Sequence, residues 1–251
     1  MTQRYFIEIA YNGKRYHGWQ VQPNAISVQA VLNDCLSKIL RSEIEVVGAG
    51  RTDAGVHAKQ LFAHFDVEEW IEDVASFLNK VNSFLPNDIS AQSLRKVGLE
   101  AHCRFDAIAR TYEYWITQHK NPFQQENSWL VHKELDVEAM NEAAQELFRF
   151  KDFSCFSKSD TQTKTNNCDI QKAIWEHKGD VLVFTIQADR FLRNMVRAIV
   201  GTLVEVGIGK ITLDKVVKII ESRDRSQAGT SVPAHGLYLI EVAYPSTIWN
   251  E

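Results

Sequence analysis

The chain of 251 residues is 45% hydrophobic and 24% charged, which fits a globular protein of one large or two modest domains. A formal net charge of −4 argues against a general polyanion binder, although residues 1–60 and 151–225 carry a small basic excess. Four cysteines without a CxxC pair argue against zinc and disulfide frameworks and fit a reducing cytosol, and no apolar run is long enough to cross a bilayer.

The first half of the chain predicts alternating strands and helices. The strand at residues 4–11 is expected to place on one face Tyr5, Ile7, Ile9 and Tyr11. A helix follows at 27–40, with Ser27 as its N-cap and apolar residues at i, i+3 and i+4 spacing. Strands are expected at 44–50 and 61–67, and a helix near 68–84. The inward residues of that helix are expected to be Trp70, Val74, Phe77, Leu78 and Val81.

The second half of the chain predicts a similar series. A strand at 111–117 shows Tyr112, Tyr114 and Ile116 on one face, and Asp136 caps a helix that ends near residue 150. Residues 157–168 are nearly free of apolar side chains and predict a long exposed loop, which in a compact domain is often functional. The remaining elements are expected to be a strand at 181–188, helices at 190–207 and after Thr212, and a strand at 237–244.

The order of these elements predicts an α+β fold with antiparallel sheets and helices on one face. We expect two domains, because the two halves follow similar series of elements. The boundary is expected near the segment from Arg104 to Thr111, which divides the chain into residues 1–104, with a glycine-rich loop, and residues 105–251, with an arginine-bearing helix.

The glycine-rich loop GAGRTDAGVHA, from Gly48 to Ala58, is the most informative stretch of the chain. Its glycines permit positive φ angles and the close approach of another molecule to the backbone. A hairpin usually turns in two residues. A longer loop that carries both Arg51 and Asp53 therefore favours a functional site, the alternative being a long hairpin loop with an Asp turn.

The predicted helix at 190–207 has a broad apolar face and a narrow polar stripe. At 100° per residue the stripe contains Arg190, Arg193, Asn194, Arg197 and Gly201. Three arginines with a glycine above them can receive a phosphate backbone or hold a carboxylate. The alternative is an ordinary solvated polar face.

The segment YHGWQVQ, from Tyr16 to Gln22, places aromatic side chains beside Gly18 in a loop. Tyr16 and Trp19 are candidates for stacking on a nucleobase. They also fit a hydrophobic plug under a loop, and the sequence slightly favours the plug.

Several other kinds of site are disfavoured by spacing. His57, His64 and His102, with Asp53 or Asp66, show no HExxH or similar arrangement, so no metal site is predicted. The glycine-rich loop lacks the GK[ST] of a phosphate-binding loop, and the chain lacks the GxSxG elbow of a serine hydrolase. A glycosidase needs two facing carboxylates, and the loop offers one.

Five motifs in order along the chain closely resemble the tRNA pseudouridine synthase A family. They are YHGWQVQ, GAGRTDAGVHA, HCRFDAIARTYEYWI, FLRNMVRAIVG and GLYLIEVAYP. The resemblance runs from Tyr11 to Pro245, and GRTDAGVHA is its most specific part. Two departures are small: Cys103 stands where alanine is more usual, and the spacing from Asp53 to Tyr112 is one residue longer than is typical.

The resemblance implies isomerisation of uridine to pseudouridine at positions 38 to 40 of the tRNA anticodon stem-loop, by a homodimer without a cofactor. It implies two pseudo-repeated ferredoxin-like (RNP-like) halves in one extended, mainly antiparallel sheet with helices on one face. It also assigns residues. Asp53 is expected to be the catalytic nucleophile, Arg51 and Tyr112 to lie in the active site, and Arg197 to pair with Asp53. Membrane association is not expected, and the location is expected to be cytoplasmic.

Some alternatives stay open at the level of sequence. Asp53 can attack the ribose, attack the base or take a sugar proton, and one carboxylate can suffice because uracil leaves as a delocalised anion. A catalytically inactive RNA-binding protein of the same fold is disfavoured by the intact set of Asp53, Arg51, Tyr112 and Arg197. A ferredoxin-like enzyme acting on a small molecule is disfavoured by the arginine stripe and the polar loop.

Overall fold

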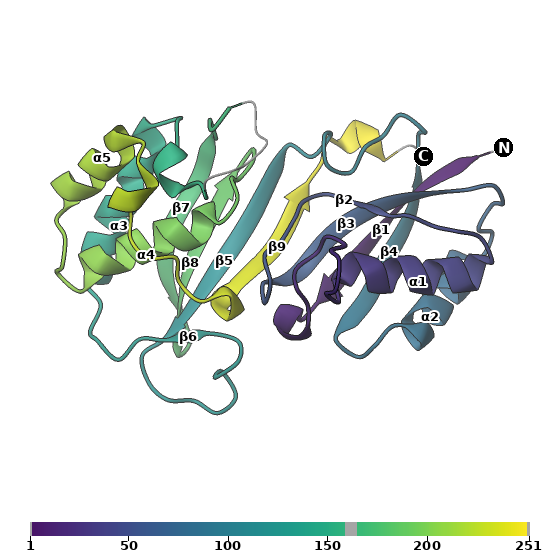
Figure 1. Ribbon diagram of the computed structural model, residues 1–251, viewed down its shortest axis with the longest axis horizontal. Helices are drawn as coiled ribbons and strands as arrows, with labels where there is room; N and C mark the ends of the chain where they lie inside the picture. The colour runs from purple at the N-terminus through teal and green to yellow at the C-terminus, as the bar shows by residue number, and fades with distance from the viewer. Residues whose placement is uncertain (1, 159–164, 250–251) are drawn as a thin grey trace. The chain divides into compact units, whose positions relative to one another are not determined.

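A computed structural model describes residues 2–158 and 165–249 of the chain. The chain separates into two compact units (Figure 1). The first unit spans Met1–Ile108 and Tyr238–Glu251, and the second spans Ala109–Leu237. Within the described ranges, no helix is both long and apolar enough to span a membrane.

The first unit is built on a mixed sheet with β1 (Gln3–Tyr11) near its centre. β4 (Ile89–Val97) and β3 (His57–Val67) flank β1, and both pair with it in antiparallel fashion. The short strand β2 (Val47–Gly48) pairs with β3 opposite His64 and Ala63. β9 (Leu237–Ala243) pairs in parallel with the start of β3, where His57 lies opposite Tyr238.

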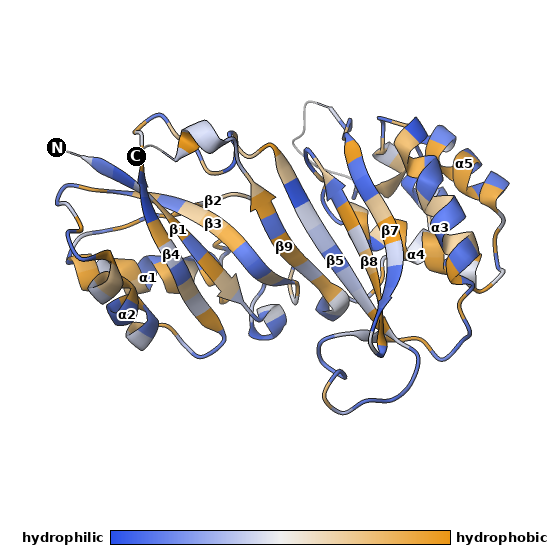
Figure 2. Ribbon diagram, turned by 180° about the vertical axis from the view of Figure 1, so that it is seen from behind, coloured by the Kyte–Doolittle hydropathy of each residue, from blue (hydrophilic) through white to orange (hydrophobic). Residues whose placement is uncertain are grey.

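Helices α1 (Val28–Leu40) and α2 (Val74–Phe84) cover one face of this sheet (Figures 1 and 2). Ser27 caps α1 as predicted, since its hydroxyl accepts a hydrogen bond from the N–H of Ala30. The face of β1 that was expected to be apolar packs beneath the helices, with all four predicted residues buried: Tyr5, Ile7, Ile9 and Tyr11. The capped amphipathic helix and the alternating strand were therefore both predicted correctly.

The expected start of the second helix was wrong. α2 begins at Val74, because the Asp73 side chain accepts from the N–H of Ser76 and caps the helix there. Trp70 lies before the helix and is 67% exposed, so it does not point into the core. Its ring instead receives the Lys96 ammonium, whose nitrogen lies 4.8 Å from the ring centroid.

The opposite face of the sheet is covered by the end of the chain. Phe6 and Phe62 on the strands meet Tyr244 and Trp249 in a cluster of edge-to-face and tilted rings, with centroids 5.4–5.9 Å apart. Such aromatic contacts add stability beyond the apolar area that they bury. Both faces of the first unit's sheet therefore contribute to its core.

The second unit contains an antiparallel sheet in the order β5 (Ala109–Thr117), β8 (Val181–Ala188) and β7 (Ile170–Lys178). The short strand β6 (Trp129–Leu130) pairs in parallel with β5. β5 and β8 match the predicted strands, whereas β6, β7 and, in the first unit, β4 were not expected. The chain therefore adopts the expected α+β class, with strands in both units accompanied by helices.

Three helices belong to the second unit: α3 (Val137–Gln145), α4 (Met195–Gly207) and α5 (Leu213–Ser222). Asp136 caps α3 as predicted, accepting from the N–H of Ala139 at 2.9 Å. α3 and α4 pack closely where Gly207 meets Met140, since a Cβ on Gly207 would lie 2.4 Å from the methionine sulfur. Short 3-10 turns occur at Gly13–Arg15, Glu146–Arg149, Ser154–Phe156, Arg225–Gln227, Ala234–Gly236 and Ser246–Ile248.

Half of the predicted polar loop at 157–168, residues 159–164, lies outside the described residues. Its described C-terminal end is anchored. Cys168 is buried and its N–H donates to the carbonyl of Lys151, and Asn167 forms a bridge with Asp152.

Candidate functional site

The glycine-rich loop joins β2 to β3 in the first unit. Arg51 is exposed on this loop, whereas Thr52 and Asp53 are half-buried. A half-buried carboxylate on an irregular segment remains accessible to a ligand while its backbone is held by the fold. The loop predicted as the candidate site therefore presents Arg51 and Asp53 from one short, supported segment.

The backbone on both sides of Asp53 is held by the segment that follows β1. The N–H of Trp19 donates to the carbonyl of Thr52, and the N–H of Gly55 donates to the carbonyl of Tyr16, each at 3.2 Å. Within the loop, the N–H of Val56 donates to the carbonyl of Asp53 at 3.2 Å. The motif around Tyr16 and the motif around Asp53, separate in the sequence, therefore form one structural unit.

Two glycines allow these segments to touch. A Cβ on Gly13 would lie 1.9 Å from the carbonyl oxygen of Val56, and one on Gly18 would lie 2.3 Å from that of Thr52. Gly18 also has φ = +85°, a conformation that side-chain-bearing residues rarely adopt. The contact that fixes the loop therefore requires glycine at both positions.

We expect Gly13→Ala to destabilise the protein by at least about 2 kcal/mol, because the new methyl group would collide with backbone rather than with a flexible side chain. The matched control is Gly50→Ala in the glycine-rich loop, where nothing lies within 4 Å of an added Cβ. Urea unfolding of both variants measures the difference. Equal stabilities would show that the contact between Gly13 and Val56 does not constrain the loop.

Tyr16 and Trp19 form the hydrophobic plug that the sequence favoured over a base-stacking pair. They are 5% and 2% exposed, respectively. The Tyr16 hydroxyl donates to Asp88 at 2.6 Å, and the Trp19 ring packs so closely on Gly48 that a Cβ there would lie 2.4 Å from it. These rings therefore support the loop from below.

Tyr112 lies on β5 in the second unit and is half-buried, with its ring edge-on to Phe191 at a centroid distance of 5.2 Å. Tyr114, on the same strand face, is buried, and its hydroxyl donates to the carbonyl of Pro233 at 2.8 Å. Burial raises the pKa of Tyr114 above its ordinary value. Of the two tyrosines, only Tyr112 keeps exposed surface for a ligand.

Arg197 lies in the first turn of α4, also in the second unit, and is half-buried. Its Nε donates to the carbonyl of Val232 at 2.7 Å, and its own carbonyl accepts from the N–H of Val232 at 3.3 Å. The backbone of Val232 thus holds one edge of the guanidinium, so the fold fixes the orientation of this planar group.

The predicted stripe on the 190–207 helix was wrong in two respects. α4 begins at Met195, because Asn194 adopts φ = 65°, a left-handed conformation that asparagine tolerates and a helix does not. Arg190 and Arg193 therefore precede the helix. Gly201 does not face an open surface, since a Cβ there would lie 2.0 Å from the carbonyl oxygen of Thr230.

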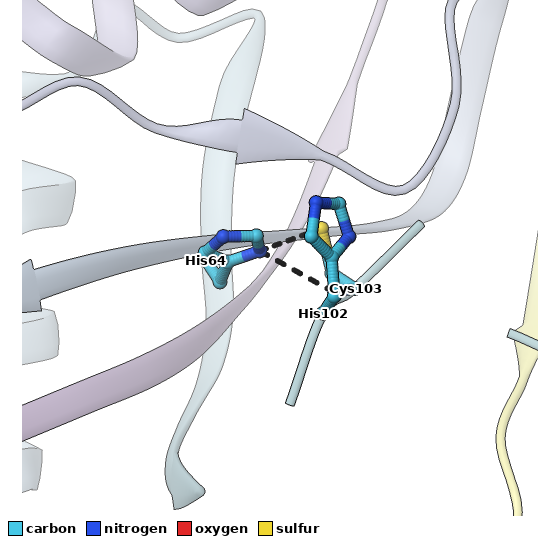
Figure 3. A group of neighbouring side chains, drawn as sticks. All are labelled: His64, His102 and Cys103. Carbon is cyan, nitrogen blue, oxygen red and sulfur yellow. Dashed lines mark hydrogen bonds between the residues drawn. The ribbon is translucent and has the colours of Figure 1, made fainter. Parts of the chain in front are cut away.

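Three residues of metal-binding type come together in the first unit, although their spacing in the sequence does not indicate a site. His64, His102 and Cys103 place one potential ligand atom each within 4.8 Å of one another (Figure 3). Each of these side chains already makes a hydrogen bond to backbone. The Cys103 thiol donates to the carbonyl of Val47 at 2.8 Å, and its N–H donates to His64 Nδ1 at 3.3 Å.

His102 Nδ1 accepts from the N–H of Arg104 at 3.1 Å. Burial, with the nearby Arg4 and His102, lowers the pKa of His64 to about 4, so its ring is neutral at physiological pH. The three side chains thereby tie β2 and β3 to the turn at residues 102–104. We interpret the group as a structural hydrogen-bond network rather than a metal centre.

The other residues weighed as ligands also have structural contacts. His57 Nδ1 accepts from the N–H of Gly13 at 3.0 Å, and its ring stacks on Tyr238. Asp66 forms a bidentate ion pair with Arg4, which lowers the pKa of the carboxyl group.

Comparison with known proteins identifies the family. The model of a tRNA pseudouridine synthase family matches residues 8–106 and 143–245. The chain belongs to this family. The first matched range contains the Asp53 loop and the second contains Arg197.

Relatives named tRNA pseudouridine synthase A match the chain along nearly its full length. The protein of Parabacteroides distasonis is 53% identical over 247 residues, which cover 98% of each chain. That of Bacteroides fragilis is 54% identical over 250 residues, and that of Exiguobacterium sibiricum is 36% identical over 245 residues. The chain is therefore a member of an isomerase family that modifies tRNA.

Proposed function

We propose that the protein converts uridine to pseudouridine in the anticodon stem-loop of tRNA, at positions 38 to 40, with Asp53 as the nucleophile. The observation that carries the proposal is the family match over both halves of the chain, in which Asp53 lies on a clamped and partly accessible loop. The full-length relatives support tRNA as the substrate.

The chemistry agrees with a site that offers one carboxylate. The reaction breaks the bond between ribose and the base nitrogen, turns the uracil over and rejoins it through carbon 5. All atoms of the base are retained except the hydrogen on carbon 5, which is exchanged for a proton on the nitrogen, so no oxidant or co-substrate is needed. A covalent step at Asp53 on the ribose or the base, or removal of a sugar proton, is compatible with this outcome.

We propose roles for the other predicted residues, as the family resemblance implies. A base within a stem must leave its stack before it can react. We propose that Arg51, which is exposed near Asp53 in the loop, fills the space in the stem that the extruded base leaves. We assign the half-buried ring of Tyr112 to stack on the extruded base, and the anchored guanidinium of Arg197 to hold Asp53 ionised.

We further propose that the two units are ferredoxin-like pseudo-repeats. In the first unit β1, α1, β2, β3, α2 and β4 follow one another, and the strand order is β4-β1-β3 with β2 beyond β3. In the second, apart from the short strand β6, the chain order is β5, α3, β7, β8 and α4, and the strand order is β5-β8-β7. The first, third and second strands are therefore arranged alike in both units.

We also propose that the protein acts as a homodimer in the cytoplasm. Its four cysteines are buried and form no disulfide, which fits a reducing compartment. Sedimentation at equilibrium would test the dimer directly, since a mass near 28.7 kDa would indicate a monomer.

The proposed activity is tested by incubating the protein with unmodified tRNA transcripts and mapping pseudouridine along the strand. We expect modification at uridines 38, 39 and 40, and loss of the signal at each position when that uridine is replaced by cytidine. Modification confined to another part of the tRNA would overturn the assignment to the anticodon stem-loop while leaving the family activity intact.

Affinity for tRNA is expected to fall as salt is added, because phosphate contacts release counterions. If Arg190 and Arg193 contact phosphates, replacing either one with alanine should reduce the log–log slope by about one unit. Lys38→Ala, at an exposed lysine paired with Asp34 on α1, is the control. Slopes equal to that of the wild-type protein would remove both arginines from the interface.

A further inference from the structure

We infer that Tyr11 is a positioning residue for the reaction, which acts by fixing Thr52 and hence the carboxylate of Asp53. The inference rests on the proposed role of Asp53. Its basis is a hydrogen bond of 2.8 Å between the hydroxyl groups of Tyr11 and Thr52. This bond joins the end of a central strand to the residue directly before the proposed nucleophile.

Tyr11 is a rigid anchor for such a contact. It is the last residue of β1 and is 5% exposed, and its backbone lies opposite Ala58 of β3 and Ile89 of β4. A side chain held between two paired strands presents its hydroxyl at a fixed position. The next residue is fixed too, because the N–H of Asn12 donates to the carbonyl of Asp88 at 2.9 Å.

Thr52 is held through both its backbone and its side chain. Its carbonyl, which forms the peptide bond to Asp53, accepts the N–H of Trp19, and its hydroxyl meets Tyr11. The backbone contact alone leaves the side chain and the preceding Arg51 less restrained. The hydroxyl pair therefore adds a second attachment point immediately before Asp53, on a segment without regular secondary structure.

The attachment of Thr52 to Tyr11 should affect the rate of the proposed reaction. A nucleophile must lie within a narrow range of distance and angle from the reacting atom, and a displacement of about 1 Å can reduce the rate a hundredfold. The fold needs the hydroxyl much less than it needs the ring, since phenylalanine at position 11 would keep the buried aromatic surface. Catalysis and stability should therefore respond differently when only the oxygen is removed.

The test compares Tyr11→Phe with Tyr5→Phe in the full-length protein. Tyr5 lies on the same face of the same strand, is 1% exposed, and accepts a hydrogen bond from the N–H of Ile71, away from the loop. We expect Tyr11→Phe to lower the single-turnover rate by about tenfold to a hundredfold, with the Kd for tRNA within about twofold of wild type. Tyr5→Phe should keep the wild-type rate. Any decrease in its melting temperature should be similar to the decrease caused by Tyr11→Phe.

Changes at Thr52 complete the test. Thr52→Ser retains a hydroxyl and should stay active, whereas Thr52→Val should be as slow as Tyr11→Phe. The double variant Tyr11→Phe, Thr52→Val should be no slower than either single variant, because both remove the same bond. Multiplicative losses in the double variant, or a wild-type rate for Tyr11→Phe, would overturn the inference.

The outcome is distinguishable from failure of the proposed function. If Asp53→Asn abolishes turnover while Tyr11→Phe is fully active, only the positioning role is wrong. If Asp53→Asn remains active, the assignment of the nucleophile itself is wrong.

Discussion

Replacing Asp53 with asparagine is expected to abolish pseudouridine formation while leaving the fold and tRNA affinity nearly unchanged. Asparagine has the shape of aspartate but cannot act as a nucleophile or as a base at neutral pH. The loop is held by backbone bonds of Asp53 and its neighbours and by the bond between the Thr52 and Tyr11 hydroxyls, and the change removes none of these. Loss of a covalent or basic catalyst usually lowers the rate by several powers of ten.

The measurement is the single-turnover rate with enzyme in excess over tRNA, accompanied by a thermal melt and a Kd for tRNA. Asp34→Asn is the matched control, since Asp34 is exposed on α1 and pairs with Lys38 one helical turn away. A rate for Asp53→Asn within about tenfold of wild type, which corresponds to about 1.4 kcal/mol in activation free energy, would exclude Asp53 as the catalyst.

Arg197→Ala is expected to reduce both activity and stability. The substitution leaves the carbonyl of Val232 without the guanidinium that donates to it at 2.7 Å, a loss of about 1–3 kcal/mol for a group away from water. If Arg197 also pairs with Asp53, the carboxylate left without its partner raises this cost further, although it is only half-buried. Arg197→Lys should retain part of the stability but not the activity, because a lysine cannot reproduce the planar fork.

The proposed pairing is tested by a double-mutant cycle in urea unfolding. Removing Asp53 as well, in Arg197→Ala, Asp53→Ala, should restore stability relative to Arg197→Ala alone. Strictly additive free energies of unfolding would show that the two residues are not partners. Arg149→Ala, at an exposed arginine paired with Glu146, shows the effect of losing a surface charge.

Elements with a strong local signal were predicted well from the sequence. Ser27 and the apolar spacing after it define α1, and the mostly apolar segment at 181–188 defines β8, which is buried almost throughout. Both depend on residues that are close in the chain. Local pattern was sufficient where capping and burial of one segment decide its structure.

Two of the missed strands, β4 and β7, lie at the outer ends of their sheets. β4 and β7 each have one neighbouring strand, and each mixes apolar residues with exposed polar and charged ones. An edge strand is stabilised by its neighbour more than by its own burial, so its sequence carries a weak signal. The pairing of β9 with β3 could not be predicted either, because no local sequence pattern indicates a contact between residues 57 and 238.

The residues of the candidate site remain predictions, and the sequence did not predict the contacts that support the glycine-rich loop. The sequence distinguished the loops around Tyr16 and Asp53 as separate motifs, and it gave no reason to join them. Their contact depends on Gly13 and Gly18, whose lack of a side chain is significant only when the opposing carbonyl oxygens are in place. In α4, helical periodicity continued across Asn194, where the left-handed backbone interrupts it.

The central claim, that this protein forms pseudouridine through Asp53, is tested most directly by release of label from carbon 5. Joining ribose to carbon 5 displaces the hydrogen that this carbon carried, so tritium placed there must pass to water, about one per pseudouridine formed. Wild-type protein with labelled, unmodified tRNA should release tritium without added metal or nucleotide, and Asp53→Asn should release none. Equal release by both proteins, or no release by the wild-type protein from any of several unmodified tRNAs, would contradict the account.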